Sequence, residues 1–383
     1  MKEGWEYKRL EEICTPINGL WKGKKEPFVN VGVIRNANFK KDFTLDFSNI
    51  EYLDVEAKKF ASRKLEPGDL IVERSGGSEK QPVGRAVLFN QSEGDYSFSN
   101  FTSVIRINDR KQVSPIFLFK YLLYFYLKGE TRPMQNAAIG LHNLDFKRYL
   151  SIEVPVPPLS EQKRIVSYLD STFAKIDALA KNAEASLNEA KALFQSALST
   201  MMEPKEGWEE KHLDELAENL DNKRIPVKLD KRKEGQYPYY GASGIVDYVE
   251  DYIFDGNYLL VSEDGANLFA RTTPIAFSVS GKFWVNNHAH ILKFDNGFTQ
   301  QFVEYYFKSI NIKEYITGAA QPKLTQRNLN KIPIYIPSIK EQQLVVGDLK
   351  KLENIIQQLQ SNLTHTLAEC AALKQALLRQ TFE

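Results

Sequence analysis

The sequence of 383 residues contains little cysteine and no long hydrophobic run. Its two cysteines, Cys14 and Cys370, are far apart and show neither metal-binding nor redox spacing, so we expect free thiols in a reducing compartment. No apolar stretch approaches the roughly 20 residues that a membrane helix needs. The run 117–127 is apolar but short, and it contains Lys120. Residues 1–5 carry charge and glycine in place of the apolar core of a signal peptide, which predicts a cytoplasmic protein.

An excess of charge of one sign is also absent. Lys and Arg number 50 against 49 for Asp and Glu, which gives a formal net charge of +1. A strongly basic balance would by itself have pointed to nucleic acid. A DNA-binding function would therefore need locally arranged positive charge, or charge supplied by partner subunits. Hydrophobic residues make up 43% and charged residues 26%, values typical of a globular chain with two or three domains.

Motifs of common catalytic and cofactor sites are missing as well. Gly281-Lys282 lacks the upstream glycine and the following hydroxyl residue of a phosphate-binding loop. The chain contains no Gly-x-Gly-x-x-Gly after a strand, no Asn/Asp-Pro-Pro-Tyr/Phe tetrapeptide of amino-methyltransferases and no clear nuclease cluster. His288 and His290 alternate on a predicted strand and so face one side, but no third metal ligand is evident near them. We therefore expect no catalytic centre, no metal and no bound cofactor.

The chain does contain one plan twice. Residues 2–6, Lys-Glu-Gly-Trp-Glu, return as residues 205–209, at an offset of 203. The segment 152–162, which ends in Pro-Pro-Leu-Ser-Glu-Gln, returns in similar form as 332–342, at an offset of 180. The region between these anchors is thus 23 residues shorter in the second copy. Constant ends around a different middle indicate a shared frame that carries two different inserts.

A long helical segment follows each Glu-Gln. Its apolar residues recur at alternating steps of three and four, the seam of a coiled coil. Each helix covers about 40 residues, or about 60 Å at 1.5 Å per residue. We expect the two helices to pair antiparallel, which would place the variable regions at opposite ends of a rod; the alternative is that each helix packs on its own domain. The expected seam includes Ile165, Leu169, Ile176, Leu179 and Leu193 in the first helix and Val345, Leu349, Leu352, Leu373 and Leu377 in the second.

Both variable regions have the pattern of mixed α/β domains. Short β-prone runs bounded by Gly, Pro, Asn and Asp precede one helix in each region. The expected helices are 114–128 and 298–310. The order of elements agrees although the residues differ, which predicts two domains of one fold with different surfaces. The expected strands are 28–31, 69–72, 84–89 and 102–107 in the first region and 258–261, 275–279 and 290–294 in the second.

Polar loops carry the candidate recognition chemistry. Arg pairs with guanine, Asn and Gln pair with adenine, and carboxylates accept from cytosine N4, while Lys and backbone amides hold phosphates. Loops 73–81 and 262–267 each follow a strand, and segments 135–140 and 318–323 precede the proline anchors. For any single residue, an ordinary solvated loop is the alternative. The candidate DNA-contacting residues are Arg35, Asn36, Arg74, Ser75, Ser78, Lys80, Gln81, Gln135, Asn136, Tyr240, Ser243, Glu263, Asp264, Asn267, Arg271, Asn287, His288, Gln321 and Lys323.

The combined pattern resembles the specificity (S) subunits of type I restriction-modification enzymes. Segment 154–162, Val-Pro-Val-Pro-Pro-Leu-Ser-Glu-Gln, looks like the signature that opens the conserved helices of that family, and 334–342 is its duplicate. The Gly-Trp pairs at 4–5 and 207–208 are similar to the start of each target-recognition domain. In the second anchor Ser-Ile replaces Pro-Leu at 338–339, yet the Glu-Gln and the heptads persist. The resemblance covers the whole chain.

The fold implied by the resemblance is of the α+β class. Two mixed α/β target-recognition domains would be separated by two long helices that form an antiparallel coiled coil, with a pseudo-two-fold internal repeat. The expected bounds are 1–157 and 204–337 for the recognition domains, and 158–203 and 338–383 for the helices.

The function implied by the resemblance is non-catalytic. Each domain would read one half of a bipartite, asymmetric target in double-stranded DNA, and the helices would act as a ruler for the spacer. Two methyltransferase (M) subunits would dock on the helices and bring S-adenosylmethionine, two motor-nuclease (R) subunits would complete the complex, and no membrane would be bound. The alternatives are a coiled-coil adaptor whose heads bind other proteins, and an enzyme that uses the Glu263-Asp264 pair.

Overall fold

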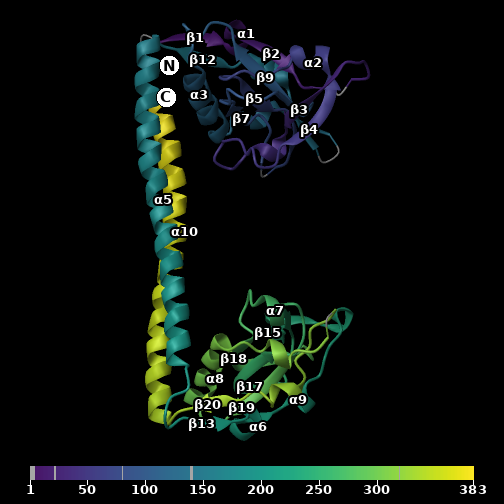
Figure 1. Ribbon diagram of the computed structural model, residues 1–383, viewed down its shortest axis with the longest axis vertical. Coiled ribbons are helices and arrows are strands. Elements are labelled where there is room, and N and C mark those ends of the chain that lie inside the picture. Colours follow the sequence, from purple (N-terminus) through teal and green to yellow (C-terminus); the bar gives the residue numbers. More distant parts are fainter. Residues whose placement is uncertain (1–4, 21–22, 80, 139–140, 319) are drawn as a thin grey trace. The chain divides into compact units, whose positions relative to one another are not determined.

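The chain folds into two compact units that share two long helices (Figure 1). Unit 1 comprises Met1–Asn182 and His365–Glu383, and unit 2 comprises Ala183–Thr364. Helices α5 (Leu159–Met201) and α10 (Ile339–Phe382) contribute to both units. In the described part of the chain, no helix is long and apolar enough to cross a membrane. The computed structural model describes residues 5–20, 23–79, 81–138, 141–318 and 320–383.

Unit 1 is built on a four-stranded sheet among the described residues, with the strand order β2-β9-β5-β7. The two central strands are buried along their whole length except at Arg106, as their apolar and β-branched residues predict. In chain order the elements are β1 (Glu6–Arg9), α1 (Leu10–Ile13), β2 (Cys14–Asn18), β3 (Phe28–Ile34), η1 (Asn36–Asn38), β4 (Glu51–Glu56), α2 (Ala57–Ala61), β5 (Leu70–Glu73), β6 (Ser75–Gly77), β7 (Ala86–Leu88), β8 (Tyr96–Phe98), β9 (Thr102–Ile107), α3 (Pro115–Leu127), η2 (Arg132–Met134), β10 (Gln135–Ala138), β11 (Leu141–Leu144), α4 (Phe146–Leu150) and β12 (Glu153–Val156).

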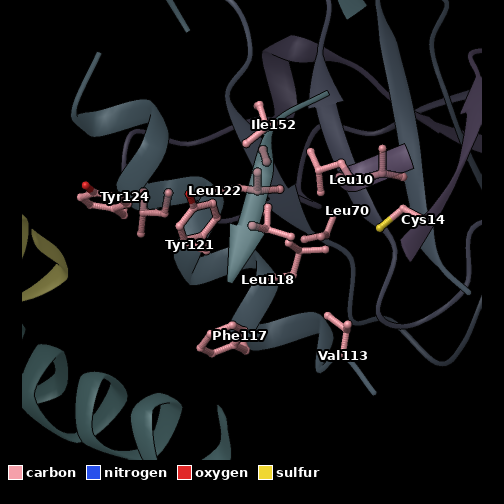
Figure 2. Packing of buried hydrophobic residues seen from close by; sticks show 14 of the residues in the cluster. Leu10, Cys14, Leu70, Val113, Phe117, Leu118, Tyr121, Leu122, Tyr124 and Ile152 are labelled. Carbon is pink, nitrogen blue, oxygen red and sulfur yellow. The ribbon is translucent and has the colours of Figure 1, made fainter. Parts of the chain in front are cut away.

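Helix α3 joins the sheet of unit 1 to the long helices. Figure 2 shows Leu118 and Leu122 of this helix lying toward Leu10 and Leu70 in the main core. The same core includes residues from both long helices, and the Phe382 ring lies 5.3 to 5.7 Å from three aromatic rings of α3. The end of α10 is therefore a structural part of unit 1.

Unit 2 repeats this plan around a six-stranded sheet among the described residues, with the order β14-β19-β17-β18-β15-β16. Helix α8 is capped by Asn296, whose side chain accepts from two backbone amides of the first turn. In chain order the elements are β13 (Glu209–Lys211), α6 (Leu213–Leu216), β14 (Ala217–Asn219), η3 (Asp221–Lys223), η4 (Leu229–Lys231), β15 (Glu234–Gly241), β16 (Gly244–Val249), β17 (Phe254–Ser262), α7 (Asn267–Ala270), β18 (Ala276–Val285), β19 (Ala289–Phe294), α8 (Gly297–Ser309), η5 (Lys313–Tyr315), α9 (Gln326–Leu329) and β20 (Ile334–Ile336).

The two long helices pair in each unit. In unit 1, Lys374 Nζ lies 5.4 Å from the Phe173 ring centroid, and Cys370 Sγ lies 3.7 Å from the Ile176 carbonyl oxygen. Residue numbers rise along α5 as they fall along α10, so the pairing is antiparallel. In unit 2 the end of α5 and the beginning of α10 share one hydrophobic core, as an antiparallel pair requires. The expected fold class is confirmed, with two mixed α/β domains and an internal repeat.

One row of the predicted seam is wrong. Leu187 is buried and Phe194 half-buried on α5, whereas their predicted neighbours in the seam face outward. The period of 3.5 allows either a three-four or a four-three order of steps. The seam of the first helix was predicted by shifting the seam of the second helix by 180 residues. This shift selected the wrong order of steps, because the small residues of the first helix are compatible with both orders. The misplaced seam residues Leu179, Leu193 and Leu373 are 60%, 70% and 49% exposed.

A buried glutamine ties the first long helix to its domain. Gln162 is fully buried, and its Nε2 donates to the carbonyl oxygens of Gln112 and Pro157, both at 2.8 Å. Its Oε1 accepts from the backbone N–H of Ser114 at 2.8 Å. Because Ser114 immediately precedes α3, this amide joins the first turns of α5 and α3.

Gln342 makes the equivalent connection in unit 2. Its Nε2 donates to the Pro337 carbonyl at 2.7 Å, and its Oε1 accepts from Thr299 Oγ1 at 2.9 Å in the first turn of α8. Both partners and the glutamine are buried. The glutamine of each repeated Glu-Gln thus connects a long helix to its globular domain through buried hydrogen bonds.

Replacing Gln342 with Ala is expected to destabilise the chain by about 1–3 kcal/mol, because the Thr299 hydroxyl and the Pro337 carbonyl lose their buried partner. Urea unfolding of the full chain measures the loss. Gln357→Ala, at an exposed position of the same helix, is the matched control and should change stability by less than about 0.5 kcal/mol. Equal effects of the two substitutions would contradict the structural role of Gln342.

Candidate functional site

Three neighbouring segments form the candidate site of unit 1. They are η1, the segment after β5 that includes β6, and the turn 99–101 between β8 and β9. The Arg74 backbone N–H donates to the Phe101 carbonyl at 2.9 Å, which joins the last two segments. The Asn36 side-chain amide donates to the Ser75 carbonyl, which joins η1 to β6. The residues Asn36, Arg74, Ser75 and Phe101 are thereby brought to one edge of the domain from three different segments.

Arg74 is held in a defined position at this edge. Its Nη1 donates to Asn18 Oδ1 at 3.1 Å and to Ser103 Oγ at 3.3 Å. The guanidinium carbon lies 4.6 Å from the Phe146 ring centroid, a cation–π arrangement. Partial burial lowers the pKa of Arg74, yet an arginine remains charged at neutral pH. The described hydrogen bonds of the side chain all leave from Nη1, so other N–H groups can address a ligand.

The candidate residues around Arg74 differ in the contacts that their side chains already make. Arg35 forms an ion pair with Glu51, and the Ser75 hydroxyl donates to Asn143 Oδ1. Asn136 is exposed on β10, opposite Asn143 in the antiparallel register.

The remaining candidates of unit 1 serve local structure. Gln135 accepts from the Val83 backbone N–H at 3.0 Å and donates to the Arg132 carbonyl. Ser78 and Gln81 are exposed and close a turn on each other through two hydrogen bonds. Lys80 lies outside the described residues.

Unit 2 builds its candidate site from the same segments. The Glu263 backbone N–H donates to the His288 carbonyl at 2.8 Å, as Arg74 does to Phe101. The Leu324 N–H donates to the Glu263 carbonyl at 2.7 Å, as Leu144 does to that of Arg74 at 2.8 Å. The backbone frame is thus repeated while the side chains on it change. Contacts join four candidates here, namely Glu263, Asp264, His288 and Lys323. The segments that carry Tyr240, Ser243, Asn287 and Gln321 adjoin them through the hydrogen bonds from Asn286 to Tyr240, from Ser262 to Ala242 and from Gly265 to Pro322.

A network of ion pairs and hydrogen bonds stabilises the segments that form this site. Glu263 lies 2.7 Å from Arg224 and 3.2 Å from Lys323 Nζ. Buried His290 places Nδ1 2.6 Å from an Asp221 carboxylate oxygen and Nε2 2.8 Å from the Leu324 carbonyl. Burial opposes ionisation of Asp221, but the contacts with His290 and neighbouring donors outweigh it, so the pKa of Asp221 lies below its usual value. The network anchors the segment that carries Lys323.

Asp221, Glu263 and His290 also have the residue types of a metal site, with ligand atoms within 4.8 Å of one another. Arg224 contacts both carboxylates, at 2.7 Å to Glu263 and 3.4 Å to Asp221. Both ring nitrogens of His290 face acceptors, and a carbonyl cannot donate, so Nε2 carries a proton rather than a lone pair. These contacts favour an ion-pair network over metal ligation.

Asp264 and His288 form a pair at the surface of unit 2. His288 Nδ1 lies 2.9 Å from both carboxylate oxygens of Asp264. The His288 side chain is 48% exposed, whereas that of Asp264 is 15% exposed. The carboxylate therefore orients an imidazole that faces solvent. His288 and His290 were expected to alternate on one strand and face the same side, but β19 begins at Ala289, and the two imidazoles contact different carboxylates.

Two candidates of unit 2 are engaged elsewhere. Asn267 binds Thr272 and Thr273 and closes the turn after α7. Arg271 adopts a left-handed backbone conformation (φ 51°) and donates to the carbonyls of Phe307 and Ile310, at 2.9 and 3.1 Å. Arg271 thus satisfies carbonyls at the end of α8.

Sequence reasoning missed Phe101 in unit 1. Its ring is 52% exposed, and its carbonyl has the place that the His288 carbonyl has in unit 2. Aligning the turns that precede β9 and β19 could have found it, because both turns contain Asn immediately before this residue. The Asp221–Arg224 contribution was also missed, since these residues lie on a segment far from the loops in sequence.

Comparisons with known proteins agree on one family. The chain matches the family model described as "Type I restriction modification DNA specificity domain" at residues 2–189 and 205–366. A putative type I restriction enzyme specificity subunit of Haemophilus influenzae is 39% identical over 142 residues, which cover 37% of this chain and 36% of that protein. A putative type I restriction enzyme MjaX specificity subunit of Methanocaldococcus jannaschii is 23% identical, over 93% of this chain and 88% of that protein.

A solved structure supports the fold. This structure comes from work on the structural basis of complex assembly and conformational transition of the type I R-M system. The match has a TM-score of 0.79 at 16% sequence identity and covers 100% of this chain and 98% of that chain. At this identity the likeness establishes the architecture of two domains and two long helices.

Asp221→Asn is expected to destabilise unit 2 by about 3 kcal/mol at neutral pH, because His290 loses the carboxylate 2.6 Å from its Nδ1 and Arg224 keeps only one of its two carboxylate partners, Glu263. The pKa of Asp221 is lower in the folded chain than its ordinary value of 3.8. Its contribution is therefore complete above that value and is lost as the pH falls through the lower folded-state pKa.

The difference between the wild type and Asp221→Asn should shrink as urea unfolding is repeated from pH 7 toward pH 3. Asp230→Asn, at an exposed position of η4, is the control and should show no such dependence. A difference that stays constant over this range would contradict the ionised state of Asp221.

Proposed function

Because the chain belongs to the type I restriction modification DNA specificity family, we propose that it is the subunit that reads the DNA target for a type I enzyme. One observation supports this above the others. The two units carry the same backbone frame at the site, yet Arg74 and Phe101 in one are replaced by Glu263 and His288 in the other. A repeated frame with divergent side chains suits a protein that reads two different sequences.

Each recognition domain reads one half of a bipartite, asymmetric target. The first domain comprises residues 1–157 and the second 204–337. In the first, Arg74 is placed to address guanine, with Asn36 and Asn136 as candidates for adenine. In the second, His288 and Lys323 are candidates for base and phosphate contacts, and Lys323 is oriented by Glu263.

The helices at 158–203 and 338–383 set the spacer between the half-sites. Readers on one face of a duplex need centres about one helical turn, or ~34 Å, apart. The α5 helix has 43 residues, which corresponds to about 65 Å at 1.5 Å per residue. A continuous helical pair of that length is stiff enough to hold two domains at a defined separation.

Catalysis resides in partner subunits. Two M subunits dock on the helices and adjacent domain surfaces and bring S-adenosylmethionine, and R subunits complete the restriction complex. The carboxylates of Glu263 and Asp264, the pair that an enzyme would use, each hold a cation or a histidine in this chain. The net charge of +1 also fits a subunit whose partners supply much of the phosphate neutralisation.

Co-expression of the chain with the methyltransferase subunit encoded beside it, followed by mapping of adenine methylation across a host genome, tests the proposal. We expect a single split motif with a fixed gap. A stable complex that methylates no split motif would overturn the proposal and favour an adaptor whose heads bind proteins.

Arg74→Ala is expected to relax selectivity at one base pair of the first half-site, since a bidentate arginine–guanine contact contributes about 1–3 kcal/mol of discrimination. The methylated motif of the variant measures the change. The second half-site is the internal control and should stay intact, and Arg9→Ala, at an exposed position of β1, should leave the whole motif unchanged. Unchanged selectivity in Arg74→Ala would remove this residue from the readers.

Removal of one heptad from both α5 and α10 is expected to change the accepted spacer without altering either half-site, because the seam of the coiled coil keeps its register. The spacer is read from the same methylation map. Gln357→Ala, which preserves the helix length, should keep the original spacer. An unchanged spacer in the shortened variant would contradict the ruler function.

A further inference from the structure

A recess in unit 1 borders the candidate site and has no assigned role. Its volume is about 290 Å³, and it opens between β3, β4, η1 and the turn 99–101. Two of its walls belong to the site already described, because Asn36 binds the Ser75 carbonyl and Phe101 accepts from the Arg74 N–H. Its lining includes the apolar residues Leu20, Val33 and Val55 and the polar residues Arg35, Asn36 and Ser99.

The lining combines an apolar surface with unused polar groups. Among the described residues, Ser99 Oγ, Asn36 Oδ1 and Arg35 Nε have no hydrogen-bond partner although each atom is buried. Ser99 is only 8% exposed. A buried polar atom without a partner costs about 1–3 kcal/mol. Three residues that line the recess thus each hold one unpaired polar atom, which is closed to solvent in the empty recess and would meet a ligand only after a shift of its side chain.

Phe101 lines the recess and is 52% exposed. A large aromatic side chain in solvent next to arginine and amide groups is the arrangement that stacks on a nucleobase. Stacking on an aromatic ring contributes about 1–3 kcal/mol per base. The recess therefore offers a stacking surface at its mouth and hydrogen-bonding groups in its wall.

The concave shape of the recess determines which part of a DNA molecule it can accommodate. Base edges of an intact duplex lie at the floor of a groove ~8.5 Å deep, where only a protruding element reaches them. A recess instead receives a group that leaves the stack. Its volume of about 290 Å³ is at the lower limit of small-molecule pockets, roughly 300–1,000 Å³, which suits one planar ring system.

We propose that this recess binds one unstacked nucleobase, stacked on Phe101 and hydrogen-bonded by Asn36, Arg35 or Ser99. The proposal rests on the DNA-reading function for the source of the base, because the recess shares its walls with the candidate readers. An extruded base of the target and a free deoxynucleotide have the same chemistry, and the experiment distinguishes them.

The first arm uses the complex with its methyltransferase subunits and duplexes of the mapped target in which 2-aminopurine replaces each base of the first half-site in turn. Unstacking raises the fluorescence of this probe. We expect a several-fold rise at one position, which Phe101→Ala abolishes and Ser99→Ala reduces. Phe28→Ala, an aromatic residue 40% exposed in β3 outside the recess, is the control and should preserve the rise. A base extruded by the methyltransferase itself would keep its signal in all three variants.

The second arm titrates the chain with dAMP, dCMP, dGMP and dTMP by calorimetry. Binding that Phe101→Ala removes and Phe28→Ala retains, without any Phe101-dependent rise in the first arm, would support the recess and make a free nucleotide its ligand. If the complex methylates a split motif but neither arm gives a Phe101-dependent signal, the proposed base binding by the recess is wrong and the proposed function is unaffected. A complex without a split motif would overturn the proposed function, and the nucleotide titration would still decide the recess.

Discussion

The structure depends on a buried amide at the start of each long helix. Gln162 and Gln342 each donate to the carbonyl of a proline that precedes the long helix and accept from a donor at the start of a domain helix. Because these hydrogen bonds are buried, the amide joins the first turn of each long helix firmly to its own domain. Each domain thereby receives a fixed orientation on its segment of helix.

The part of the site that the two units share is held by backbone hydrogen bonds. The bonds from Arg74 to Phe101 and from Glu263 to His288 use only main-chain atoms. Side chains at these positions can therefore change without loss of the frame, which is why arginine in one unit is glutamate in the other. Loops on a rigid scaffold are where binding specificity is expected to vary.

The two sites nevertheless differ in their chemistry. Unit 1 offers a pinned guanidinium, an exposed phenylalanine and a recess with unused polar atoms. Unit 2 offers an oriented imidazole and a lysine supported by the Asp221–Arg224–Glu263–His290 network. The first arrangement suits a planar ligand, and the second suits directed hydrogen bonds and phosphate. The proposed reading of two unlike half-sites would require this asymmetry.

The sequence by itself determined the repeat, both long helices, and helices α3 and α8 to within about two residues, because period and capping are local properties. It missed β15 and β16, where glycine, proline and tyrosine obscure the strand pattern. Only the tertiary structure decided that Leu187 rather than Leu179 belongs to the seam, that Arg271 caps α8 and that Glu263 is held in ion pairs. Each of these depends on partners distant in sequence, and a one-dimensional pattern does not encode which partner a side chain meets.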